Sequence, residues 1–287
     1  MKLATIEFSG NEYSGIIHED KLYPFASLGF PCTNMNDFLV RGGVGELQNL
    51  YKKIGESSSI FLADAKLLAP IPEPRQDIIC LGLNYLGHAE EAKNFNIKTE
   101  HKYPIYFSKR VNRSTNPGDI LYGHFDVDNT LDYEAELGVI IGKDTYKIAP
   151  EDVFGHILGY TIINDVSARK LQKRHSQWYL CKSLDGYAPM GPYIVTEDQF
   201  SRPPELNIET RVNGTIYQSN NTKNLVFGLE RIISELSNGM LLKAGTIIAT
   251  GTPEGIGKGK FPPEFLVPGD TVECEIENIG ILRNTVQ

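Results

Sequence analysis

Apolar residues along the chain fall in short runs separated by glycine, proline, asparagine or aspartate. From residue 78 onward, these runs have the length of β-strands: 78–81, 104–107, 137–141, 157–163, 192–196, 206–212, 246–249 and 271–277. Helix-like patterns are fewer, at about 85–95, 167–177 and 227–238. Strands and helices do not alternate regularly, which disfavours a doubly wound sheet. The pattern predicts an α+β fold with a large mixed sheet.

The first 70 residues have the pattern of a small separate module. Two short strands, Lys2–Phe8 and Tyr13–His18, predict a hairpin, and helix-like stretches follow at 36–40 and 45–54. Pro70, Pro72 and Pro74 alternate with other residues, which favours an extended, semi-rigid connector. We therefore expect a small N-terminal α/β domain over residues 1–70 and a second domain over 71–287.

Composition and charge narrow the class of protein. Of 287 residues, 41% are hydrophobic and 22% charged, as in soluble globular proteins. The net charge of −8 disfavours nucleic-acid binding, and no apolar run is long enough for a membrane span. The N-terminus lacks the apolar stretch of a signal peptide, and the four cysteines form no C-x-x-C pair. We expect a cytoplasmic protein with reduced thiols that binds neither nucleic acid nor membrane.

Two glutamates, Glu134 and Glu136, stand at the head of the apolar run 137–141. In a strand, alternate side chains share a face, so both carboxylates would point the same way. A third acid, Asp165, follows the next strand-like run. Three oxygen donors without a nearby Cys or His pair favour a hard cation such as Mg²⁺ or Mn²⁺. An edge strand with solvated acids is the alternative that the Glu-x-Glu pattern alone leaves open.

A histidine and a glutamate lie three residues apart in the predicted helix 85–95. At this spacing, His88 and Glu91 share a helix face. A carboxylate beside an imidazole fixes its tautomer and raises its basicity, which suits a general base that activates water. A surface histidine beside solvated acids fits the same pattern.

Three further segments contain candidate ligand-binding residues. Arg169 and Gln172 are also three apart, so they could together hold a substrate carboxylate or keto oxygen, or they could be solvated on an amphipathic helix. Lys182 follows an apolar triplet, so it could support an acid cluster, form a Schiff base or be solvated. Thr252 lies in a glycine-rich turn that exposes backbone N–H groups to an anion, although a plain tight turn fits equally.

Taken together and in this order, these segments resemble the fumarylacetoacetate hydrolase family. The resemblance covers about residues 75–287, which correspond to the family's catalytic domain. It rests on collinear motifs: G-x-N-Y-x-x-H-x-x-E (82–91), D-Y-E-A-E-L-x-V-x-I-G-K (132–143), N-D-V-S-A-R-x-x-Q (164–172), K-S-L-D-G-x-A-P-x-G-P (182–192), T-G-T-P-x-G-x-G (250–257) and G-D-x-V-x-x-E-I-x-x-I-G-x-L-x-N (269–284).

The resemblance implies roles for nine residues. The family's metal ligands fall on Glu134, Glu136 and Asp165. Its water-activating dyad falls on His88 and Glu91, and its site lysine falls on Lys182. Its substrate contacts fall on Arg169, Gln172 and Thr252. It also implies a mixed β-roll with flanking helices, usually as a homodimer, with Mg²⁺ or Mn²⁺ as cofactor.

The chain departs from the family pattern in two respects. The family often has F-x-K-P after the third strand, whereas this chain has Phe107-Ser108-Lys109-Arg110. We expect Arg110 to add charge near the pocket. Members with isomerase and decarboxylase activity often carry two tandem copies of the domain, and this chain has one.

The sequence thus predicts a divalent-metal-dependent enzyme that cleaves a C–C bond in a short 2-oxo acid. Acylpyruvate hydrolysis and oxaloacetate decarboxylation both pass through a pyruvate enolate that a metal would stabilise. Two alternatives remain: an isomerase, decarboxylase or dehydratase of a 2-oxo or 2-hydroxy dienoate, and an inactive oxo-acid-binding protein. The polar segment 92–103 is expected to be either a lid over the site or a surface loop. Residues 95–103 and 215–224 are expected to be variable loops that set specificity.

Overall fold

The computed structural model describes residues 1–93 and 102–287. Most of the segment expected to form a lid or a surface loop, 94–101, lies outside the described residues. No helix in the described part of the chain is long and apolar enough to cross a membrane.

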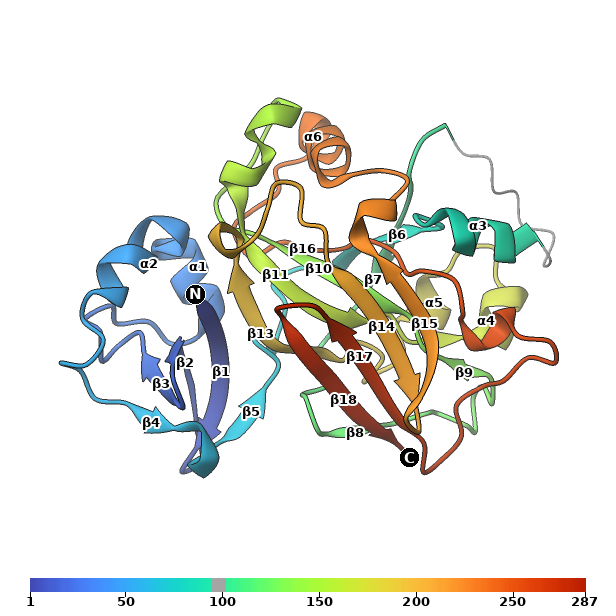
Figure 1. Ribbon diagram of the computed structural model, residues 1–287, viewed down its shortest axis with the longest axis horizontal. Helices are drawn as coiled ribbons and strands as arrows, with labels where there is room; N and C mark the ends of the chain where they lie inside the picture. Colours follow the sequence, from blue (N-terminus) through green and yellow to red (C-terminus); the bar gives the residue numbers. More distant parts are fainter. Residues whose placement is uncertain (94–101) are drawn as a thin grey trace.

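One large mixed sheet runs through the molecule in the order β4-β3-β2-β1-β13-β11-β10-β16-β6-β7, with β5 paired to β1 (Figure 1). Its strands are β1 (Lys2–Phe8), β2 (Asn11–His18), β3 (Lys21–Pro24), β4 (Ile60–Phe61), β5 (Lys66–Leu68), β6 (Ile78–Gly82), β7 (Ile105–Lys109), β10 (Ala135–Ile141), β11 (Ile157–Asn164), β13 (Met190–Thr196) and β16 (Ile247–Ala249). Most pairs are antiparallel, whereas β16 and β6 are parallel.

A second sheet has the order β15-β14-β17-β18-β8, and β9 pairs with β12. These strands are β8 (Ile120–Leu121), β9 (Leu131–Asp132), β12 (Ser167–Ala168), β14 (Asn207–Val212), β15 (Thr215–Asn221), β17 (Thr271–Ile276) and β18 (Gly280–Val286). The helices are α1 (Met35–Arg41), α2 (Gly43–Tyr51), α3 (Leu86–Lys93), α4 (Arg169–Arg174), α5 (Tyr179–Lys182) and α6 (Leu229–Gly239), with 3₁₀ turns η1 (Leu62–Asp64), η2 (Pro150–His156), η3 (Glu197–Gln199), η4 (Thr222–Asn224) and η5 (Gly257–Gly259). This architecture confirms the α+β prediction.

The central strands β10 and β11 are buried along their whole length. Leu137 and Val139 pack into the apolar cluster that also contains residues of α6 and of the second sheet. Ile140, on the opposite face, packs into the cluster that contains residues of α1 and α2. This alternation places Glu136 on the face opposite Leu137, as the strand pattern requires.

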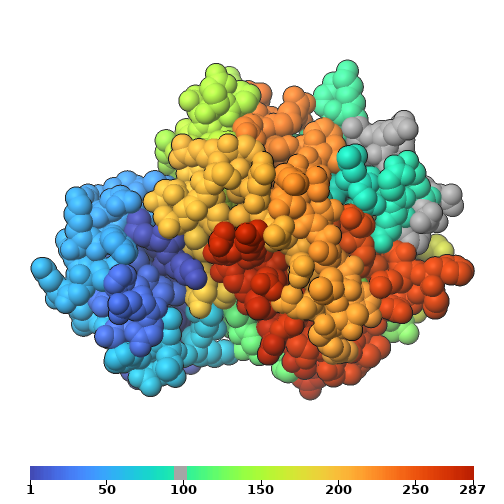
Figure 2. Space-filling view, viewed as in Figure 1, coloured from blue at the N-terminus to red at the C-terminus, as the bar shows by residue number. Residues whose placement is uncertain are grey.

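The N-terminal residues extend the main sheet. β1 pairs antiparallel with β13, so β1 to β4 continue the sheet that carries β10 and β11. Figure 2 shows these residues, in blue, packed directly against the rest of the molecule. The division into domains at residue 70 stays a prediction.

Two expectations about secondary structure were wrong. Residues 215–224 were expected to be a variable loop, but 215–221 form β15, which pairs antiparallel with β14. The helix expected over 167–177 begins only at Arg169, because Ser167 and Ala168 pair with β9.

Candidate active site

Three carboxylates converge where β10 and β11 meet. Glu134 directly precedes β10, Glu136 lies within it, and Asp165 directly follows β11. The antiparallel register places Ala135 opposite Asn164, so the Asp165 N–H donates to the Glu134 carbonyl oxygen at 2.8 Å. One oxygen from each acid lies within 4.8 Å of the other two, and all three side chains are buried.

This donor set fits a hard divalent cation. Carboxylate oxygens are the ligands that Mg²⁺ and Mn²⁺ prefer. Burial, together with the charges of Asp165 and Glu134, raises the pKa of Glu136 well above its usual range. A cation between the three acids would offset that repulsion and favour the ionised form of Glu136.

Two buried lysines contact the same acids. Lys182 Nζ lies 2.6 Å from Glu134 Oε2 and 2.6 Å from Asp165 Oδ2. Lys109 Nζ, at the end of β7, lies 2.7 Å from Asp165 Oδ1. Burial alone would raise the pKa of Glu134, but Lys182 and Arg169 hold it well below its usual range. Glu134 is thus charged and paired, as a buried ion must be, and Asp165 is paired with both lysines.

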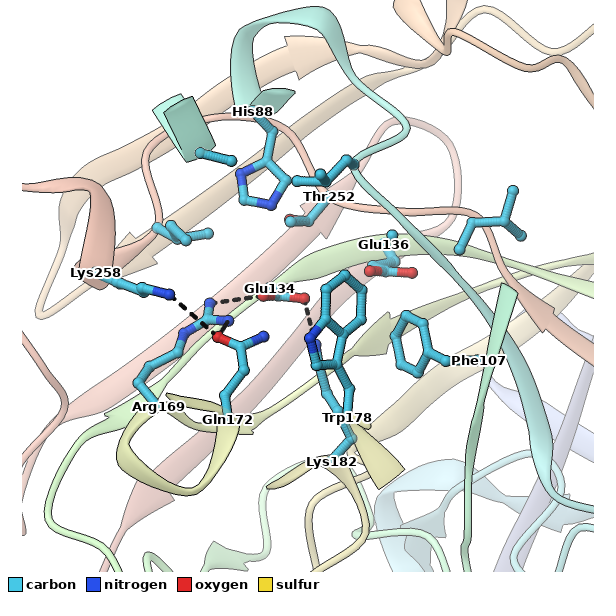
Figure 3. Close-up of a pocket in the computed structure, with 15 residues that line it drawn as sticks. His88, Phe107, Glu134, Glu136, Arg169, Gln172, Trp178, Lys182, Thr252 and Lys258 are labelled. Carbon is cyan, nitrogen blue, oxygen red and sulfur yellow. Dashed lines mark hydrogen bonds and ion pairs between the residues drawn. The ribbon is translucent and has the colours of Figure 1, made fainter. Parts of the chain in front are cut away.

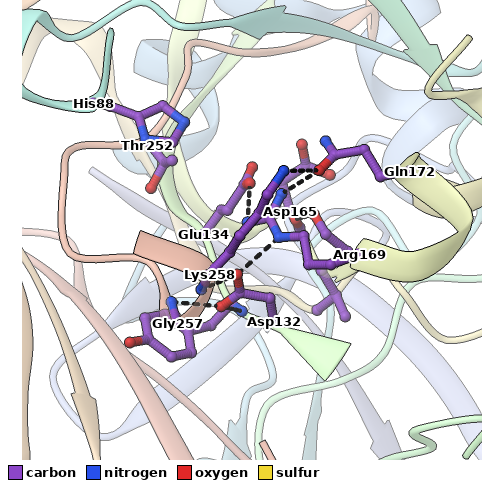
Figure 4. Close-up of polar contacts among 12 residues, drawn as sticks. His88, Asp132, Glu134, Asp165, Arg169, Gln172, Thr252, Gly257 and Lys258 are labelled. Carbon is purple, nitrogen blue, oxygen red and sulfur yellow. Dashed lines mark hydrogen bonds and ion pairs between the residues drawn. The ribbon is translucent and has the colours of Figure 1, made fainter. Parts of the chain in front are cut away.

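Arg169 connects the acid cluster to a second polar group. Its Nη2 donates to Glu134 Oε1 at 2.6 Å, and its Nε donates to Asp132 Oδ2 at 2.7 Å. Its Nη1 donates to Gln172 Oε1 at 3.3 Å, one turn further along α4. Lys258 Nζ lies 3.4 Å from the same Gln172 oxygen. Figure 4 shows these contacts as one continuous network.

The predicted dyad forms on α3. His88 Nδ1 lies 3.0 Å from Glu91 Oε2, and the imidazole is largely buried. The other Glu91 oxygen accepts a bond from the Gly255 N–H at 3.2 Å, which joins α3 to the glycine-rich turn after β16. Gly251, in the same turn with φ +97°, donates its N–H to Glu136 Oε2 at 2.8 Å.

One pocket joins most of these groups. Figure 3 shows His88 and Thr252 on one side, Glu134 and Glu136 at the base, and Arg169, Gln172 and Lys258 on the opposite side. The lining comprises Leu81, Gly82, Leu83, His88, Ala92, Phe107, Glu134, Glu136, Arg169, Gln172, Trp178, Lys182, Thr252, Ile256 and Lys258. Trp178 and Phe107 form an apolar wall, with ring centroids 5.2 Å apart.

All nine candidate residues lie in or directly beside this pocket. Seven of them line it, while Asp165 contacts the lining residue Lys182 and Glu91 contacts the lining residue His88. Thr252 Oγ1 accepts a bond from Gln218 Nε2 at 2.8 Å. Arg110 does not line the pocket: its side chain is exposed and donates to Asn112. Its effect on the charge near the pocket stays a prediction.

Sequence reasoning missed Lys109, Asp132 and Lys258. Lys109 holds the lysine position of the F-x-K-P pattern, and Asp132 opens the motif at 132–143, so both could have been found there. Lys258 directly follows the glycine-rich motif and carries no signal of its own. Its position in the pocket follows only from the structure, in which its ammonium group contacts Gln172.

Comparisons with known proteins agree with the geometry. The sequence profile described as "Fumarylacetoacetate (FAA) hydrolase C-terminal" matches residues 77–287. The chain is 41% identical to oxaloacetate tautomerase YisK from Bacillus subtilis, over 100% of both chains.

Solved structures with a similar fold cover the whole chain. Fumarylacetoacetate hydrolase from the psychrophilic Exiguobacterium antarcticum is 37% identical, with a TM-score of 0.85 over 100% of this chain and 99% of that one. Maleylpyruvate hydrolase from Sphingobium sp. SYK-6, solved with manganese(II) and pyruvate, is 26% identical, with a TM-score of 0.78 over 100% of this chain and 98% of that one.

Proposed function

Because the chain belongs to the fumarylacetoacetate hydrolase family, we propose that it is an enzyme that enolises a short 2-oxo acid, with keto–enol tautomerisation of oxaloacetate as its reaction. One observation carries this proposal: the histidine of the His88–Glu91 pair lines the same pocket as the acid cluster and the cations Arg169 and Lys258. The tautomerase relative supports the choice of substrate.

We propose that Glu134, Glu136 and Asp165 hold Mg²⁺ or Mn²⁺. A divalent cation there would act as a Lewis acid that polarises the 2-oxo group and stabilises negative charge on its oxygen. The chain's own cations have a different task. Lys182 keeps Glu134 ionised and holds both Glu134 and Asp165 in place, and Arg169 and Lys258 would attract the substrate anion.

His88 would move the proton. Because Nδ1 faces the Glu91 carboxylate, Nδ1 holds a proton and Nε2 is left to act as the base. In the keto-to-enol direction, Nε2 would remove a proton from C3, the C3–H electron pair would form the C2–C3 double bond, and the C2–O π pair would move to the oxygen. The His88 imidazolium would then give the same proton to that oxygen, which returns the imidazole to its neutral form. The reverse direction returns the proton to C3. Trp178 and Phe107 line the pocket with apolar surface and would shield it from water.

Hydrolysis of an acylpyruvate is a second candidate. The same His88–Glu91 pair could activate water, and the similar maleylpyruvate hydrolase was solved with pyruvate. Oxaloacetate decarboxylation would need the cation site but no base. The C–C cleavage that the sequence predicts therefore remains a proposal beside tautomerisation.

Parallel assays separate these reactions. Enol absorbance of oxaloacetate and pyruvate release are followed together in Mg²⁺-loaded protein, and pyruvate release from acetylpyruvate is measured separately. Tautomerase activity predicts faster loss of enol without pyruvate. Pyruvate from oxaloacetate would identify a decarboxylase, and pyruvate from acetylpyruvate a hydrolase. Turnover of neither compound would contradict the proposed function.

A further inference from the structure

Lys258 lines the pocket within the turn η5, on the side of Arg169 and Gln172 (Figure 3). Its ammonium group and the Arg169 guanidinium both reach Gln172 Oε1, at 3.4 and 3.3 Å. Two cationic side chains thus reach the same point of the wall, beside their other contacts. An anion between them would gain two charge-assisted hydrogen bonds.

Asp132 places both cations. Its buried carboxylate accepts bonds from the Gly257 N–H at 2.8 Å and the Lys258 N–H at 3.0 Å, and it also binds Arg169 Nε at 2.7 Å (Figure 4). The backbone of Lys258 and the guanidinium of Arg169 are thus fixed by the same acid. Such fixing holds the backbone from which the lysine side chain extends, which lowers part of the ordering cost of binding.

The acid cluster and this wall are close neighbours. Arg169 donates to Glu134 with one terminal nitrogen and to Gln172 with the other. The Arg169 guanidinium and the Gln172 amide thus connect the acid cluster to Lys258. A short molecule with an anionic group at each end could contact both.

Electrostatics favour an anion at this place. Burial, and next the charge of Arg169, lower the pKa of Lys258. A carboxylate held there would offset both effects, because an opposite charge stabilises the ammonium form.

We propose that Lys258, positioned by Asp132, is the specificity-determining residue that binds the distal carboxylate of a 2-oxo dicarboxylic acid. This inference rests on the proposed function, because it names the substrate class of the same site. It makes the enzyme selective for a four-carbon diacid such as oxaloacetate over 2-oxo acids that lack the second carboxylate.

The test uses binding, so it does not depend on turnover. Malate and lactate are stable 2-hydroxy acids that differ in the distal carboxylate, and calorimetry measures the affinity of the Mg²⁺-loaded protein for each. The variants are Lys258→Met, Lys258→Arg and the matched control Lys260→Met. Lys260 lies two residues away, and its ammonium lies over the ring of Tyr217.

We expect the wild type and Lys260→Met to prefer malate over lactate by about 10- to 100-fold, the loss typical of one charge-assisted contact. Lys258→Met should remove this preference with lactate affinity unchanged, and Lys258→Arg should restore most of it. A preference that survives in Lys258→Met, no preference in the wild type, or no binding of either acid would overturn the proposal. Failure of the proposed function would appear separately, as absent turnover of oxaloacetate in a wild type that still prefers malate.

Discussion

At the residue scale, His88, the proposed base, has a carboxylate partner in Glu91. Glu91 binds one ring nitrogen, so the opposite nitrogen would be left as the base. The three acids, by contrast, have no part in moving a proton in this account. The two groups of residues should therefore respond differently to substitution.

Replacing His88 with alanine should lower the rates of oxaloacetate tautomerisation and acylpyruvate hydrolysis by about 10²- to 10⁴-fold, the usual worth of a general base. Any oxaloacetate decarboxylation should persist, because that step needs no base. Steady-state rates for each reaction are the measurement, with His175→Ala, an exposed histidine at the end of α4, as control. Equal loss of all activities would contradict the separate role of His88.

Replacing Glu136 with glutamine should change the metal-free protein little. Burial and the neighbouring acids raise the pKa of Glu136, so a neutral side chain of the same shape is tolerated without a cation. The variant should instead lose the stabilisation by Mg²⁺, which for the wild type is about 2.7 kcal/mol at 100 times the dissociation constant. Thermal unfolding with and without Mg²⁺ measures both quantities. Equal stabilisation of the variant and the wild type by Mg²⁺ would show that Glu136 is not a metal ligand.

Sequence reasoning could group the two glutamates, and separately the dyad, because each pair depends on local periodicity. Glu134 and Glu136 share a face through the strand repeat, and His88 meets Glu91 through the helix repeat. Lys109 and Asp132 depend on partners far along the chain, such as Asp165 for Lys109. No local period can predict such a contact.

At the scale of elements, α3 is attached to the glycine-rich turn and to η5. The Gly255 N–H binds Glu91, and the backbone of Gly259 packs closely against the same carboxylate. A Cβ atom at Gly259 would lie 1.6 Å from Glu91 Oε1. Glu91 cannot give way there without weakening its bond to His88.

Gly259→Ala should therefore lower kcat of the His88-dependent reactions by about 10²-fold, as small misplacements of catalytic groups do. The unfolding temperature should stay close to that of the wild type, because only a side chain is displaced. Gly155→Ala is the control, since a Cβ there meets nothing within 4 Å. Unchanged kcat in Gly259→Ala would show that the attachment does not position His88.

Charged pairs join β14, β17 and β18. Arg283 Nε donates to Glu273 Oε1 at 2.7 Å, and Arg211 binds the other oxygen at 3.4 Å. The bond from Arg283, against some opposition from burial, lowers the pKa of Glu273 below its usual value of 4.5. Since the folded state favours the ionised acid, this stabilisation is present above that value and is lost as the pH falls through the folded-state pKa.

Urea unfolding should accordingly show that Glu273→Gln lowers the free energy of unfolding by roughly 0.5 to 1 kcal/mol at pH 7, within the range of partly exposed pairs. The difference from the wild type should shrink as the pH falls below the usual value of 4.5 and through the lowered pKa of Glu273. A difference that is constant across this range would mean that the charge of Glu273 does not contribute.

Strands with long apolar runs could be predicted from the sequence. β10 and β11 are buried on both faces, so their sequences are almost continuously apolar. β15 and β18 mix polar and apolar residues, because one side of each is exposed, and they were not predicted. Short pairs such as β9 with β12 have too few residues for any pattern.

At the scale of the whole molecule, the N-terminal residues share a core with the site-bearing strands. Phe25 and Phe38 stack with centroids 3.8 Å apart, in the cluster that also contains Ile163 and Met190 of β11 and β13. Ile163 lies two residues from Asp165. Unfolding of the N-terminal module would therefore expose part of the core beneath the site. Dimer formation, expected from the family resemblance, stays a prediction.

Replacing Phe38 with alanine should destabilise the protein by about 3 to 5 kcal/mol. Secondary structure and activity should be lost in one transition, at a lower temperature than in the wild type. Circular dichroism and activity on heating measure this, with Val40→Ala on the exposed side of α1 as control. Activity that survives a first transition in Phe38→Ala would show that the two parts unfold separately.

The most direct test of the account is a metal titration of the enol assay. Protein stripped with EDTA is reloaded with Mg²⁺ while conversion of oxaloacetate enol is followed by absorbance. The account predicts that the rate rises from background to saturation in the wild type and stays at background in Glu136→Gln. Full activity of the stripped wild type, or equal activity of the variant, would contradict the claim that the acid cluster holds the cation on which enolisation depends.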